Sequence, residues 1–199
     1  SDVTELSASE ELALLNRVYQ KICADRAWEF LKTSTSGTMS GSGDGGYYIT
    51  IPSDFAFFYD NNTYTDNTIS AQNNTSPKVI FVGANYTPYQ IINYGDRRQY
   101  RSKTGYCYID LVNAKIYFTG TPESTTYNMD YIKVPPLLTT SDYPIFNGKF
   151  HDIITFAMAT ENDILQLSPK ATSYAGENNK KYQDYLAYMQ WHYAQMVNI

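Results

Sequence analysis

The sequence predicts an α+β protein in which both ends of the chain are helical and the middle is β-rich. Near both termini, apolar residues recur at three- and four-residue spacing, which places them on one face of a helix. Between them, short segments rich in β-branched and aromatic residues are separated by turn residues, as expected for strands. We therefore expect residues 1–36 and 137–199 to form a helical platform. Residues 37–136 are expected to form an inserted antiparallel module resembling a β-sandwich or barrel.

The first predicted helix begins at a capping box. Ser7 is followed three residues later by Glu10, a pair that can satisfy free N–H groups at a helix N-terminus. The apolar stripe behind this start consists of Leu12, Leu15, Tyr19 and Ile22.

Two polar segments are predicted to be loops. Residues 33–46 are mostly Ser, Thr, Gly and Asp, which bury too little apolar area to offset the entropy lost on ordering. Residues 60–77 are also strongly polar and are expected to form an exposed excursion between strands. Either loop is a candidate for ordering on assembly with a partner.

Seven segments of the middle region are predicted to be strands. The clearest hairpin joins two of them through Asn113 and Ala114. A two-residue turn needs positive φ at both central positions, which Ala disfavours, so we expect a longer turn. The predicted strands are 47–51, 55–59, 78–82, 89–92, 106–112, 115–118 and 127–134.

Two more helices are predicted after Pro135 and Pro136. Apolar residues at helical spacing run from Phe150 to Leu165, and Pro169 is expected to end that helix. The last helix is expected from about residue 178 to 197. Its apolar stripe consists of Tyr182, Tyr185, Leu186, Met189, Tyr193 and Met196.

Composition favours a protein that contacts other chains. The 199 residues include 15 basic and 20 acidic side chains, so the net charge of −5 argues against a dedicated nucleic-acid clamp. The 20 tyrosines combine a ring that packs with a hydroxyl that stays hydrated, as in protein interfaces. No apolar run reaches the roughly 18 residues that span a bilayer, and no secretion signal is evident, so no membrane contact is expected.

No catalytic, nucleotide-binding or metal-binding motif of the sequence lies in the structural context that its function requires. The glycines of a GxGxxG pattern at 41–46 precede a predicted strand instead of opening a helix, which argues against dinucleotide binding. His151 and His192 lack an accompanying nucleophile motif, and Cys23 and Cys107 lack metal-ligand spacing. We expect no catalytic residues, cofactor or metal. Carboxylate pairs remain open, although solvated or turn-capping roles are favoured for Asp54, Asp60, Asp110 and Asp130.

Several short stretches, taken in order, resemble a known protein family. They include an entry into the β region at 51–55, the hairpin around Asn113, and a segment from 130 to 139 with two prolines. The series ends with Asp142, Pro144, Ile145, Phe146, Lys149, Phe150, His151, Ile154, Met158 and Ala159, then Tyr182, Leu186 and Met189. This order is similar to the head-to-tail adaptors of short-tailed bacteriophages, also called neck, connector or tubular tail proteins. Two departures are Ala114 in place of an expected Gly, and Asn147 with Gly148 in place of an expected Pro.

The resemblance implies a structural virion protein without catalytic residues. Its subunits would form a ring of about twelve copies beneath the portal, with closure set by the rotation between neighbours. Such a ring extends the DNA channel, helps retain the packaged genome and docks tail tube, nozzle or fibre proteins. It would lie in the virion neck after assembly in the host cytoplasm. Packaged double-stranded DNA would pass without sequence-specific binding, and an acidic lumen would repel its phosphates.

Aromatic residues near the C-terminus are the candidate partner interface. Trp and Tyr are the usual anchors of protein contacts, and a chain end can reach a neighbouring molecule. Packing within the same subunit is an equally weighted alternative. The candidate residues are Trp191, Tyr193, Met196 and Ile199, together with Tyr143 and Phe146 from the preceding loop.

The sequence also allows a second class of function, binding of a carbohydrate or a receptor. A carbohydrate- or receptor-binding β module of a virion or cell surface would use Tyr and Trp to stack on sugar rings and Asn to bond hydroxyl groups. The helical ends argue against this alternative, because a simple β-sandwich does not need helices at its carboxyl end.

Overall fold

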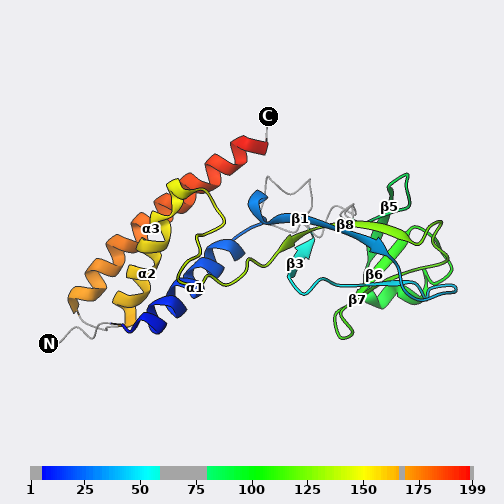
Figure 1. Ribbon diagram of the computed structural model, residues 1–199, viewed down its shortest axis with the longest axis horizontal. Helices are drawn as coiled ribbons and strands as arrows, with labels where there is room; N and C mark the ends of the chain where they lie inside the picture. Colours follow the sequence, from blue (N-terminus) through cyan, green and yellow to red (C-terminus); the bar gives the residue numbers. More distant parts are fainter. Residues whose placement is uncertain (1–5, 59–79, 166–168, 198–199) are drawn as a thin grey trace. The chain divides into compact units, whose positions relative to one another are not determined.

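The computed structural model describes residues 6–58, 80–165 and 169–197, and it divides into two compact units (Figure 1). The helical unit comprises Ser1–Phe30 and Val134–Ile199, and the β unit comprises Leu31–Lys133. The helices therefore come from both ends of the chain, and the middle of the chain forms a nearly closed mixed β-sheet. The predicted α+β class with an inserted barrel-like module is confirmed.

The described residues of the helical unit form three α-helices, α1 (Ala8–Ala24), α2 (Asp152–Leu165) and α3 (Pro169–Val197). The capping box is present at the start of α1, where the Ser7 backbone N–H donates to Glu10 Oε2 at 2.8 Å. In return, the Glu10 backbone N–H donates to Ser7 Oγ at 3.4 Å. These bonds satisfy donors that have no partner within the helix.

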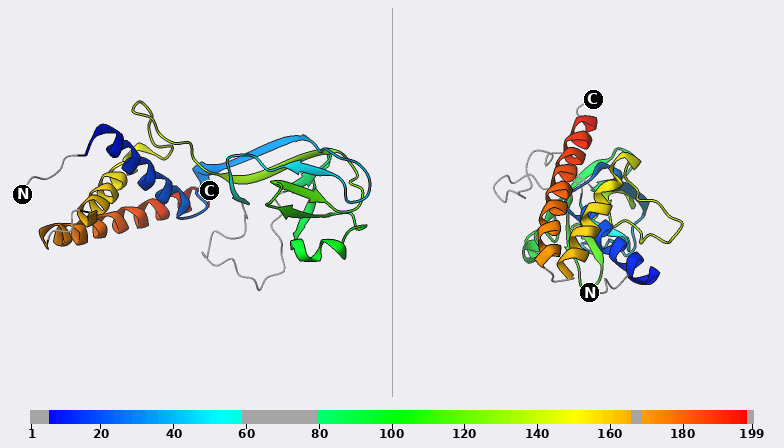
Figure 2. Two further views of the ribbon diagram at one scale, coloured as in Figure 1. Left: turned by 90° about the horizontal axis from the view of Figure 1, so that it is seen from below. Right: turned by 90° about the vertical axis from the view of Figure 1, so that its left-hand side faces the viewer.

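Helix α3 begins earlier than the sequence pattern predicts. The expected start near residue 178 is wrong, because the helix already begins at Pro169. Proline suits the first position of a helix, since its missing N–H would have no intrahelical partner there. Helices α2 and α3 lie side by side in both views (Figures 1 and 2).

Large aromatic side chains form much of the core of the helical unit. Trp28 and Phe150 are almost completely buried, and Tyr19 and Phe146 pack with ring centroids 6.1 Å apart. Burying such rings removes a large apolar area from water. The aliphatic part of this core includes Leu14, Val18, Ile22, Ile153, Ile154, Leu186 and Met189.

In the β unit, residues 31–58 and 80–133 form an eight-stranded sheet with the order β1-β8-β4-β5-β6-β7-β2, and β3 also pairs with β8. Its buried side includes Ile49, Ile80, Val82, Cys107, Ile116, Phe118 and Met129. The strands are β1 (Lys32–Thr38), β2 (Tyr48–Thr50), β3 (Phe55–Phe58), β4 (Ile80–Val82), β5 (Thr87–Ile92), β6 (Tyr106–Asp110), β7 (Lys115–Phe118) and β8 (Thr126–Lys133).

Strand β1 corrects part of the loop predicted over 33–46. Strands β1 and β8 run side by side (Figure 2), and all seven residues of β1 pair with β8, from Lys32 opposite Ile132 to Thr38 opposite Thr126. Its polar side chains are exposed or half-buried and none is fully buried, so the pairing rests on backbone hydrogen bonds that composition does not reveal. The other predicted loop, 60–77, lies outside the described residues.

One strand pair corrects the prediction of a purely antiparallel module. Strand β5 pairs antiparallel with β4 through residues 87–89, and then parallel with β6 through residues 90–92. The connection between the two parallel strands contains the short 3-10 helix η2 (Tyr94–Arg98). A parallel pair needs a crossover instead of a tight hairpin, and the 93–105 segment supplies it.

The β6–β7 hairpin has the longer turn expected from Ala114. Its last pair is Asp110 opposite Lys115, which leaves a four-residue turn, and Ala114 has a positive φ of 49°. The Asp110 carboxylate accepts from the backbone N–H of Asn113 at 3.2 Å and from its side-chain amide at 2.9 Å. This side chain therefore adds to the backbone bond from the Ala114 N–H to the Leu111 carbonyl within the turn.

Within the described part of the chain, no helix is both long enough and apolar enough to cross a membrane.

Candidate interaction surfaces

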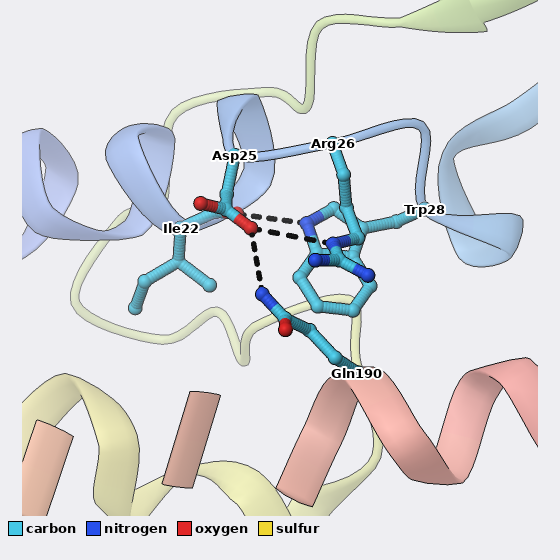
Figure 3. A network of polar contacts seen from close by, with 5 residues as sticks. All are labelled: Ile22, Asp25, Arg26, Trp28 and Gln190. Carbon is cyan, nitrogen blue, oxygen red and sulfur yellow. Dashed lines mark hydrogen bonds and ion pairs between the residues drawn. The ribbon is translucent and has the colours of Figure 1, made fainter. Parts of the chain in front are cut away.

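A small polar network holds the end of α1 against α3 (Figure 3). The Trp28 indole N–H donates to the Ile22 carbonyl at 2.8 Å, so the buried ring has a partner for its polar atom. The Asp25 carboxylate accepts from the Gln190 amide at 3.1 Å and from Arg26 Nε at 3.3 Å. The Gln190 bond therefore links α3 to the end of α1 within the helical unit.

Two of the predicted interface residues pack inside the helical unit. The Tyr193 ring lies 5.1 Å from Phe30 and 5.9 Å from Trp28, and its hydroxyl accepts from the Asn147 backbone N–H at 3.1 Å. Phe146 is only 2% exposed. Their own subunit thus accounts for most of the contacts of both rings, and partner contacts at these residues remain a prediction.

Trp191 lies in an exposed aromatic strip on α3, which we define as Tyr188 and Trp191. The Trp191 side chain is 59% exposed and stacks on Tyr188, with centroids 6.2 Å apart and planes inclined by 16°. Tyr188 is itself 49% exposed and receives Lys149 over its ring at 5.9 Å. Solvated aromatic area of this kind is characteristic of protein contact sites.

The strip includes a residue that the sequence prediction missed. Tyr188 lies outside the buried stripe of α3, which contains Leu186 and Met189. An aromatic residue out of phase with the core stripe is the sequence signal that could have found it. Of the remaining predicted residues, Met196 lies in α3 without a described side chain, and Ile199 lies outside the described residues.

The segment from Val134 to Asn147 presents a second exposed apolar group. Tyr143 is 83% exposed and Leu137 is 66% exposed. The segment is tied to α1, because the Asn16 amide donates to the Leu138 carbonyl at 2.9 Å and its oxygen accepts from the Leu138 N–H at 2.7 Å. The structure therefore holds these exposed side chains on an anchored backbone.

The histidines and the aspartate that the sequence offered as candidate catalytic residues make hydrogen bonds within the fold. His151 Nε2 lies 3.2 Å from the Phe146 carbonyl, and Lys149 donates to His192 Nδ1 at 3.1 Å. Asp54 accepts from the Tyr131 hydroxyl at 2.9 Å. Burial raises the pKa of Asp130, and the nearby Lys32 opposes that shift.

The described residues contain no group of three His, Cys, Asp or Glu side chains that could hold a metal ion. Both cysteines are free and buried. Burial raises the pKa of the Cys23 thiol to about 12 and also raises that of Cys107, which keeps both thiols protonated.

Comparison with known protein families indicates what the exposed strip and segment could serve. A family model described as SU10 adaptor protein matches residues 2–196. The chain belongs to this family. The SU10 adaptors are phage head-tail adaptors, so the resemblance noted from the short sequence stretches is confirmed. A search of curated proteins gives no match.

Membership of the SU10 adaptor family makes the chain a structural phage protein associated with portal and tail components. Exposed aromatic side chains on an ordered backbone are consistent with a protein that works through contacts with other chains.

Proposed function

We propose that this SU10 adaptor is the subunit of a ring that attaches beneath the portal of a DNA-filled capsid. The ring comprises about twelve copies and has a closed rotational symmetry. It extends the channel for packaged DNA, helps to retain the genome, and docks tail tube, nozzle or fibre proteins. The protein assembles in the host cytoplasm and resides in the virion neck, and it performs no catalytic step.

The family match over residues 2–196 is the observation that carries this proposal. It spans both units, so the helical platform and the β unit both belong to the adaptor architecture. In a virion, this architecture would attach to the portal and extend the DNA channel.

Head-to-tail packing in a ring needs two different contact faces on each subunit. The helical unit offers two exposed apolar groups: the aromatic strip of Tyr188 and Trp191, and the segment with Leu137 and Tyr143. We assign them to contacts with neighbouring copies or with the portal, because exposed aromatic anchors dominate the binding energy of such interfaces.

Mass measurement of the purified full chain, alone and mixed with a portal ring, tests this proposal. A double change, Tyr188→Ala with Trp191→Ala, removes the strip, and Tyr143→Ala removes the most exposed ring of the segment. Tyr86→Ala is the control, since Tyr86 is also exposed, at 61%, but lies in the β unit.

We expect the unaltered chain to form a closed ring on the portal, and we expect the strip variant to bind the portal at least tenfold more weakly than the Tyr86 control. This loss corresponds to about 1.4 kcal/mol or more, as expected for removing interface anchors. A chain that stays monomeric with the portal would refute the ring proposal. Unchanged binding by both helical-unit variants would refute the assignment of the contact faces.

A further inference from the structure

An ordered row of aromatic rings crosses one face of the β unit. Tyr48 on β2 pairs in register with Tyr117 on β7, which pairs with Tyr108 on β6. Tyr94 of η2 continues the row, with its ring centroid 5.7 Å from that of Tyr108. These residues lie on the side opposite the buried Ile49, Cys107, Ile116 and Phe118.

A cation stands at each end of this row. Arg97 Cζ lies 3.9 Å from the Tyr94 ring centroid, and Lys115 Nζ lies 3.9 Å from that of Tyr48. The Arg97 guanidinium also donates to the Tyr94 carbonyl at 2.7 Å, which fixes its position. We define the tyrosine–cation face as Tyr48, Tyr94, Tyr108 and Tyr117 with Arg97 and Lys115, together with the exposed Arg98, Arg101 and Lys103 of the adjoining 93–105 connection.

This face is positively charged within an acidic protein. Residues 94–118 contain five basic and two acidic side chains, a net charge of +3, whereas the whole chain carries −5. No ion pair within the described residues involves any of the five basic side chains. The helical unit contains seven basic and twelve acidic residues, and the β unit contains eight of each, so the net negative charge belongs to the helical unit.

The rings of the row are already in contact with one another. Tyr108 and Tyr117 are stacked, with centroids 5.5 Å apart and planes inclined by 17°. Tyr117 also contacts Tyr48 at 5.6 Å. Each of the four rings therefore has two neighbours among rings and cations, which disfavours a ligand that must stack on a free ring face, such as a sugar or an unpaired base.

We propose that the tyrosine–cation face binds the phosphate backbone of double-stranded DNA. This inference rests on the proposed function, in which duplex DNA passes the ring, and it names the face that meets the DNA. Phosphate backbones are recognised by Arg and Lys together with Tyr hydroxyl groups, without reading of the bases. Burial raises the pKa of Tyr108, so its hydroxyl keeps its proton as a donor. An acidic lumen was expected to repel the DNA phosphates everywhere. With this face, the ring would instead make weak, sequence-independent contacts with the DNA.

Equilibrium binding of the full chain to a fluorescent duplex of mixed sequence tests this inference. The test variant combines Arg98→Gln, Arg101→Gln and Lys103→Gln, three exposed positions. A second variant removes the same charge from the helical unit and serves as the matched control. It combines Lys21→Gln, Lys180→Gln and Lys181→Gln.

We expect the unaltered chain and the control to bind at low salt with equal affinity, and the test variant to bind at least tenfold more weakly. Log affinity falls with log salt concentration with a slope of about −0.9 for each phosphate contact, so losing three contacts should make the slope of the test variant shallower by about three units. A single strand of equal length should bind no more tightly than the duplex.

Three results would overturn the inference: no duplex binding by the unaltered chain at low salt, equal losses in the two variants, or tighter binding of the single strand. Mass measurement on the portal separates this failure from failure of the adaptor proposal. If the ring forms but DNA binding is absent, only the inference about the DNA-binding face is refuted. A test variant that fails to form the ring, while the control forms it, would show that the face binds protein instead.

Discussion

Asn16 is the residue whose loss should show how the exposed segment from Val134 to Asn147 is held in place. Its side-chain amide donates to the Leu138 carbonyl at 2.9 Å and accepts from the Leu138 N–H at 2.7 Å. It also donates to the Leu12 carbonyl at 3.2 Å. Asn16→Ala removes both bonds to Leu138, a residue that is largely buried.

The expected cost follows from these contacts. Each hydrogen bond contributes about 1 kcal/mol net, so the two bonds to Leu138 together contribute about 2 kcal/mol. Replacing Asn by Ala in a helix also gains roughly 0.6 kcal/mol of helix propensity, which hides part of the loss. Asn179→Ala on α3 is the matched control, because Asn179 is exposed and its replacement gains the same propensity.

Urea unfolding followed by tryptophan fluorescence measures this difference in the free energy of unfolding, and the signal comes from the helical unit, which contains Asn16. The chain has two tryptophans, Trp28 and Trp191, and both belong to the helical unit. We expect Asn16→Ala to lower the free energy of unfolding by about 2 kcal/mol relative to Asn179→Ala. A difference below about 0.5 kcal/mol, the usual range for surface changes, would refute the reasoning.

Three further predictions concern the backbone, the thiols and a turn carboxylate. Gly120→Ala should destabilise the β unit by about 2 kcal/mol or more in thermal unfolding, because φ is +63° and a Cβ there would lie 2.9 Å from backbone atoms, whereas Gly95→Ala, with open space, should not. Cys23 should react with a thiol reagent at mildly alkaline pH only after unfolding, since burial raises its pKa to about 12; rapid labelling of the native chain would contradict this. Hydrogen bonds from Asn113 lower the pKa of Asp110 below its ordinary 3.8. Its stabilisation is therefore complete above pH 3.8 and is lost as pH falls through the lower folded value, so Asp110→Ala should lose its stability deficit in acid titrations.

Local patterns made several elements of the fold predictable. The Ser7 and Glu10 pair marks the start of α1 because both partners of the cap lie within four residues of each other. The turn after Asp110 is longer than two residues, as predicted, although Ala114 itself adopts the positive φ that Ala disfavours. In each case the deciding interactions are close in sequence.

The candidate surfaces were only partly predictable for the same reason. Trp191 was named from its residue type and position, and it is exposed. Phe146 and Tyr193 have the same chemistry, but packing against Tyr19, Phe30 and Trp28 decides that they lie mostly inside the unit. Composition cannot distinguish an aromatic anchor that faces solvent from one that fills a core.

The sequence by itself determined the helical ends, most of the strands and the family, because helical and strand periodicities and short motifs are properties of neighbouring residues. Tertiary structure alone decided that the polar strand β1 is ordered by β8 and that β5 runs parallel to β6. It also aligned Tyr48 with Tyr117 and Tyr108 into one row. These features depend on pairing between segments far apart in the chain, whose register is set by the whole sheet and by no local stretch of residues.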